Sequence, residues 1–147
     1  ESGGLVIGLE QVPSLVRIAT RVRDYARIKG CAFTEFSLTT ESTQAIGTYD
    51  VILMLSVFHN IAHFSGYENA KEILKSLLGK THRIMIFETG ECGTSGYAAS
   101  MPDMGEDHDE WIQNLLLECG ASKVKLLGKV PVVDDSTSLR SVYAAYK

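Results

Sequence analysis

The sequence predicts an α/β protein whose mainly parallel sheet is covered by helices on both faces, in three layers. Two observations carry this prediction. Short apolar runs alternate along the chain with longer stretches in which apolar residues recur at helical spacing. The last two apolar runs are joined by a short turn, and a short connection is typical of an antiparallel pair. The expected sheet therefore ends in an antiparallel hairpin.

The first part of the chain supplies two strands and a helix. The nearly continuous apolar run from Leu5 to Leu9 predicts a buried strand. Pro13 suits the first turn of a helix, whose apolar positions continue until Gly30 ends it. Residues 32–36 predict the next strand, and a loop rich in threonine and serine follows up to Gly47.

The second part of the chain continues the alternation. In order, the expected elements are a strand at 51–55, a helix at 68–78, a strand at 83–87, a helix with Asp107 as its N-cap, and two strands at 123–130 and 139–146. The loop between the strand at 83–87 and Asp107 is too long to be a simple connection. We expect it to bind a ligand or to close over one.

Composition limits the function classes. At 147 residues the chain can bury the core of one domain, and we expect a single domain over residues 1–147. A formal net charge of −4 argues against a large nucleic-acid surface, although arginines crowd the predicted first helix. Three cysteines without metal-type spacing favour a reducing, cytoplasmic setting, and no apolar run reaches membrane-spanning length. We expect no membrane partner.

The most informative segment runs from Tyr49 to Asn60. Its apolar residues end abruptly in small and polar ones, so a buried parallel strand would carry Ser56 and His59 to the carboxyl edge of the sheet. In open α/β sheets ligands bind at that edge. The first strand ends there too, in Glu10, whose two carboxylate oxygens suit the vicinal hydroxyls of a ribose.

These features resemble the class I S-adenosylmethionine-dependent methyltransferases, which have a Rossmann-like fold closed by an antiparallel hairpin. The resemblance implies S-adenosylmethionine as the cofactor. It also implies roles for the following residues: Glu10 on the ribose, Ser37 and Leu38 on the adenine, Ser56, Val57 and Phe58 on the methionine part, and His59 as a catalytic base or acceptor contact. Serine at position 37 departs from the family, which usually has an acid there.

The family's glycine-rich loop is not present before Glu10, because Gly3 and Gly4 directly precede the predicted first strand. In the family, the strand before that loop is central. We therefore expect this chain to be the carboxyl-terminal portion of a longer domain whose N-terminal strand is missing here. Another chain or another segment is expected to supply that strand, because a buried strand edge needs a partner.

The resemblance implies methyl transfer to a small-molecule or sugar-like acceptor. His63 and Glu88 are further candidates for a base, and a metal pair of His59 with His63 lacks a third ligand, so no metal site is expected. Three alternatives stay open. The chain could be a non-catalytic domain used for protein association, an RNA methyltransferase with the arginine-rich helix as its footprint, or a nicotinamide-dependent oxidoreductase.

Overall fold

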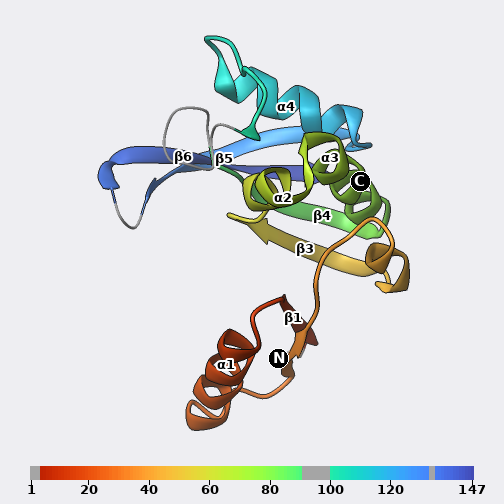
Figure 1. Ribbon diagram of the computed structural model, residues 1–147, viewed down its shortest axis with the longest axis vertical. Helices are drawn as coiled ribbons and strands as arrows, with labels where there is room; N and C mark the ends of the chain where they lie inside the picture. Colours follow the sequence, from red (N-terminus) through yellow and green to blue (C-terminus); the bar gives the residue numbers. More distant parts are fainter. Residues whose placement is uncertain (1–3, 91–99, 133–134) are drawn as a thin grey trace. The chain divides into compact units, whose positions relative to one another are not determined.

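The computed structural model describes residues 4–90, 100–132 and 135–147 (Figure 1). The chain divides into two compact units, residues 1–38 and 39–147, which are described separately. No helix within the described ranges is both long and apolar enough to cross a membrane.

The first unit is a β-α-β segment made of β1 (Val6–Glu10), α1 (Pro13–Tyr25) and β2 (Cys31–Glu35). The two strands are parallel and in register from Val6 beside Cys31 to Glu10 beside Glu35. Pro13 is the first helical residue, as predicted, because its missing N–H has no helical partner to lose. Gly30 has a φ of 70° in the turn that leads from the helix into β2.

The second unit contains a four-stranded sheet in the order β3-β4-β6-β5 (Figure 1). Its elements are a short 3₁₀ helix η1 (Ser42–Ala45), β3 (Tyr49–Leu55), α2 (Phe58–Ser65), α3 (Tyr67–Gly79), β4 (Thr81–Glu88), α4 (His108–Glu118), β5 (Lys123–Val132) and β6 (Asp135–Tyr146). β3 and β4 are parallel, whereas β6 is antiparallel to both of its neighbours.

Side-chain alternation gives the four-stranded sheet one covered and one open face. Met85, Phe87 and Tyr143 point to the covered face and are completely buried, as are Leu74 and Ile112 from the helices above. Figure 1 shows α2, α3 and α4 on this same side of the sheet. The alternate residues of β3 are exposed instead: Val51, Leu53 and Leu55 have exposed fractions of 48%, 64% and 46%.

The predicted mixture of parallel strands and a carboxyl-terminal antiparallel pair is confirmed. All the predicted strands and helices are present, and Asp107 caps α4 by accepting a 2.8 Å hydrogen bond from the Glu110 amide. Two features differ from the expected single three-layer sheet. The strands form two sheets, and the helices described in the second unit lie on one face of its sheet. The sheets are separate because, among the described residues, no strand pairs with the outer edge of β3 and connects it to β1 and β2.

Asp109 fastens α4 to the sheet. Its Oδ1 accepts hydrogen bonds from the hydroxyls of Ser141 at 2.6 Å and Tyr143 at 2.5 Å, and its Oδ2 pairs with Lys129 Nζ at 3.0 Å. The Ser141 and Tyr143 hydroxyls, helped by Lys129, lower the pKa of the Asp109 carboxyl to about 2. These contacts hold the charged form in the folded state.

Replacing Asp109 with asparagine is expected to lower the free energy of unfolding by about 2 kcal/mol at pH 7. The contribution is complete above the unfolded pKa of an aspartate, near 4, and is lost as the pH falls towards the folded pKa of about 2. Urea unfolding at pH 7 and pH 3, followed by fluorescence of the single tryptophan, Trp111, measures both effects. Glu118→Gln on the same helix removes an exposed carboxylate and serves as the control. An equal loss in the two variants would contradict the role of Asp109.

Candidate functional site

The candidate site is built at the carboxyl ends of β3 and β4, where Ser56 directly follows β3. Ser56 has a φ of 56°, a left-handed conformation that costs a residue with a side chain about 1–2 kcal/mol. Two hydrogen bonds to Glu88 hold it there: its amide donates to the backbone oxygen at 3.1 Å, and its hydroxyl donates to Oε2 at 2.6 Å. Strained residues of this kind cluster at functional sites.

Arg140 of β6 completes this arrangement. Its Nη1 donates to Ser56 Oγ at 3.0 Å and to Glu88 Oε1 at 3.2 Å. The ion pair is largely buried, because the Arg140 and Glu88 side chains are only 17% and 8% exposed. We call Ser56, Glu88 and Arg140 the edge cluster. Both carboxylate oxygens of Glu88 are occupied within it.

His59 lies in the first turn of α2 and is buried beside the residues that follow β4. Its Nδ1 accepts a 2.7 Å hydrogen bond from the Gly90 amide and lies 3.4 Å from Thr89 Oγ1. A side chain at Gly90 would place its Cβ only 3.1 Å from the imidazole ring, so glycine permits this approach. Burial lowers the pKa of His59, and the positive charge of Arg140 lowers it further, against the opposing effect of Glu88.

The His59 ring is therefore neutral at pH 7, with its proton on Nε2, because an amide can only donate to Nδ1. In this arrangement Nε2 presents a donor, and Nδ1 would have to release the Gly90 amide before it could accept a proton. The assignment of His59 as a catalytic residue stays a prediction.

The other residues predicted to hold the methionine part lie at the start of α2. Val57 is its N-cap residue and is half-buried. Phe58 is completely buried, with its ring packed edge-on against Phe87 at 5.7 Å and Tyr67 at 6.1 Å between centroids. Any contact of Phe58 with a ligand would therefore go through its backbone. Asn60 holds the turn closed by donating from Nδ2 to the Ser56 oxygen at 2.7 Å.

The predicted ribose and adenine residues belong to the first unit. Glu10 ends β1, is half-buried, and accepts a 2.8 Å hydrogen bond from the Val12 amide through Oε1. This bond leaves Oε2 for another donor. It also stabilises the turn between β1 and α1. Ser37 is exposed and Leu38 half-buried, both following β2. Their assignments to the cofactor stay predictions.

The described residues contain no group of three or more potential metal-binding side chains. His63 does not share the surroundings of His59, since its Nδ1 lies 2.9 Å from Ser100 Oγ. The described cavities lie elsewhere, at the N-terminal end of α4 and beside η1 and α3. Among the described residues, the edge cluster is a concentration of polar contacts at the carboxyl ends of β3 and β4, the edge at which open α/β sheets bind ligands.

Arg140 is the site residue that sequence reasoning missed. It lies inside the strand pattern of β6, fifty-two residues after Glu88, and nothing in the spacing connects the two. The available signal was a charged residue within an apolar strand pattern, because a charge that is buried in a sheet requires a partner. Glu88 was recognised as a polar residue at a strand end, but as a candidate base rather than as the partner of an arginine.

Comparison with known proteins identifies the fold. No protein-family model and no curated protein matches the sequence. Solved structures do match: the bifunctional kinase-methyltransferase WbdD aligns with 95% of this chain at 21% identity and a TM-score of 0.74. Magnesium protoporphyrin IX methyltransferase (ChlM) from Synechocystis PCC 6803, solved with bound S-adenosylhomocysteine, aligns with 97% at 18% identity and a TM-score of 0.66. The chain has the class I methyltransferase fold.

The methyltransferase fold is shared, but only part of each matching protein is represented. The chain spans 29% of the WbdD chain and 64% of the ChlM chain. EvdMO1 also matches, with a TM-score of 0.67 at 14% identity, and 32% of it is covered. At these identities the comparisons establish the fold alone, because one fold serves many activities.

Proposed function

We propose that this chain takes part in S-adenosylmethionine-dependent methyl transfer to a small-molecule or sugar-like acceptor. The observation that carries the proposal is the edge cluster, because a strained serine and a largely buried ion pair stand where this fold binds ligands. The relative ChlM has been solved with bound S-adenosylmethionine, which supports the same cofactor here.

The protein's part in such a reaction is to position the two reactants and to exclude water. The sulfonium of S-adenosylmethionine already makes the methyl group electrophilic, so the cofactor supplies the reactive centre. We assign Glu10 to the ribose, and Ser37 with Leu38 to the adenine. The turn from Ser56 to Phe58 faces the methionine part in this proposal. The amides of Val57 and Phe58 are the donors there, since the first N–H groups of a helix lack helical partners, whereas the Ser56 amide already donates to the Glu88 backbone oxygen.

His59 has a different part in the proposed reaction. Its neutral ring carries a proton on Nε2, so it suits a hydrogen bond to an oxygen of the acceptor. Its buried position makes the charged form unfavourable and keeps the ring neutral. Methyl transfer needs a base only when the acceptor must lose a proton.

We also propose that a further strand, carrying the family's glycine-rich loop, pairs with β3 and completes a longer single domain. The observation that supports this is the outer edge of β3, which has no partner among the described strands. Val51, Leu53 and Leu55 leave the open face of the same strand uncovered as well. We propose that a segment of the same polypeptide outside residues 1–147 supplies this strand, because parallel neighbours in a sheet are usually joined by a crossover connection within one chain.

Calorimetric titration with S-adenosylhomocysteine tests the proposed cofactor. Binding is expected for the unaltered chain, and Glu10→Ala is expected to weaken it at least about tenfold, because a carboxylate that bonds two hydroxyls contributes charge-assisted hydrogen bonds. Glu35→Ala is the matched control, since Glu35 lies beside Glu10 at the end of the neighbouring strand. Circular dichroism confirms that each variant is folded.

Two results would contradict the proposal in different ways. A folded chain that binds no S-adenosylhomocysteine would show that residues 1–147 do not hold the cofactor by themselves. Equal losses in Glu10→Ala and Glu35→Ala would remove the ribose role of Glu10 while leaving the cofactor in place.

A further inference from the structure

The edge cluster contains more polar hydrogen-bonding capacity than it uses. Within the described part of the chain, Arg140 makes two hydrogen bonds, both through Nη1, to Ser56 and to Glu88. Its Nε is buried and has no hydrogen-bond partner among the described residues. Buried donors are nearly always paired in folded proteins, so an unpaired one requires an explanation.

Stability does not supply that explanation. Removing an ion pair from water costs about as much as its attraction returns, so apolar residues would hold the three strands together equally well. The cluster adds an unpaired donor and a left-handed serine to this cost. Three unfavourable features at one place on the ligand-binding edge indicate a function.

The chemistry of the remaining groups indicates what is bound. Both oxygens of Glu88 are occupied, and the Ser56 hydroxyl already donates to one of them. The unused groups belong to the guanidinium and can only donate. A cation whose free groups are all donors suits an anionic oxygen, and the planar guanidinium binds carboxylate and phosphate groups in the same way.

We propose that Arg140 binds an anionic oxygen group, a carboxylate or a phosphate, of the methyl acceptor, and that Glu88 and Ser56 hold its guanidinium in position. The inference rests on the proposed function for its identification of the ligand as the acceptor. The anion site itself is independent of the cofactor, since none of its three residues is assigned to cofactor binding through its side chain.

Nuclear magnetic resonance tests the anion site directly. In the full chain labelled with ¹⁵N, the Arg140 Nε–H signal is assigned by its loss in Arg140→Lys. Sodium benzoate and phenyl phosphate are then titrated separately at constant ionic strength, with neutral benzamide as the uncharged analogue. A saturable shift of the Nε–H signal is expected with at least one of the two anions and not with benzamide.

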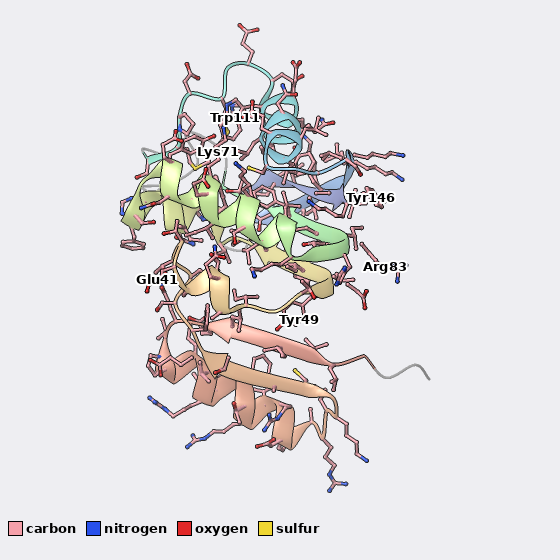
Figure 2. All side chains as sticks on the ribbon, turned by 90° about the vertical axis from the view of Figure 1, so that its right-hand side faces the viewer. Glu41, Tyr49, Lys71, Arg83, Trp111 and Tyr146 are labelled. Atoms are coloured by element: carbon pink, nitrogen blue, oxygen red, sulfur yellow. The ribbon has the colours of Figure 1, made fainter. Side chains whose placement is uncertain are left out.

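Variants separate binding from structure. Arg140→Met is expected to weaken binding of that anion at least about tenfold, as the loss of a charge-assisted hydrogen bond implies. Glu88→Gln keeps one of the two acceptor oxygens and removes the competing negative charge, so it is expected to tighten anion binding several-fold. Arg83→Met, an exposed arginine at the start of β4 that Figure 2 labels, is the matched control and is expected to change nothing.

Each outcome decides the inference. The anion that binds more tightly identifies the acceptor's group. No saturable shift with either anion, or equal shifts with benzamide, would overturn the site. Equal binding in Arg140→Met and the unaltered chain would overturn the role of Arg140, and if Arg140→Met fails to fold, Glu88→Gln decides by tightening or not. Anion binding without S-adenosylhomocysteine binding would leave this site standing and show that residues 1–147 do not hold the cofactor by themselves, and the reverse result would refute only the site.

Discussion

Glu88→Ala is expected to lower the free energy of unfolding of the second unit by about 3 kcal/mol, because it leaves the Arg140 charge largely buried without its partner. The same substitution removes the two hydrogen bonds that end on the Glu88 carboxylate, one from the Ser56 hydroxyl and one from Arg140 Nη1. Urea unfolding followed by Trp111 fluorescence measures the loss, since this tryptophan lies on α4 within the same unit.

The double substitution Glu88→Leu with Arg140→Met makes the prediction sharper. It removes both charges together, so we expect a stability within about 1 kcal/mol of the original chain or above it. The exposed pair of Lys71 and Glu118 is the control. Lys71, labelled in Figure 2, bonds Glu118 at 2.7 Å across α3 and α4, and breaking that pair is expected to have little effect. A Glu88→Ala loss no larger than that of the exposed pair would show that solvent screens the buried pair.

Phe58→Ala is expected to cost about 3–5 kcal/mol, because it opens a cavity between α2 and the sheet. The Phe58 side chain is completely buried and contacts the rings of Phe87 on β4 and Tyr67 on α3. Phe58 therefore packs the first turn of α2 against the core. Thermal and urea unfolding of the purified variant measure the loss.

Phe64 on the same helix is the matched control for this substitution. Its side chain is 72% exposed, and Phe64→Ala is expected to change the stability by no more than about 0.5 kcal/mol. Phe58→Leu, which retains most of the buried volume, is expected to lie between the two alanine variants. Similar losses at positions 58 and 64 would contradict the assignment of Phe58 to the core and restore it as a candidate for direct ligand contact.

Much of the fold could be predicted because its signals are local. The apolar run at 51–55, the proline at the start of α1 and the Asp107 cap each act within a few residues, and the structure has all three elements. Helix α2 was not predicted as an element. Its sequence FHNIAHFS is short and follows a strand with only two residues between, so it carries no clear periodicity of its own.

The candidate site was less predictable because its contacts are distant in sequence. Ser56 and His59 were found from their place after a strand, but their partners Glu88, Gly90 and Arg140 come from elements that only the fold brings together. The buried state of Phe58 likewise depends on two rings from other elements. Glu10 lies at the predicted strand end, yet strand position alone does not determine what its free oxygen binds.

The outer edge of β3, unpaired among the described strands, also affects how newly synthesised copies of this polypeptide fold. Natural edge strands usually carry a charged side chain, a proline or a bulge that discourages foreign strands. In β3, which reads YDVILML, the single charge and the irregularity in pairing both lie at the start of the strand, so the stretch from Val51 to Leu55 has neither. Nascent copies would therefore compete between correct pairing and aggregation, and the competition shifts towards aggregation as their concentration rises. Leu53→Lys, placed at the most exposed of the three apolar positions, acts as a gatekeeper and is the substitution to choose for raising the yield of soluble material.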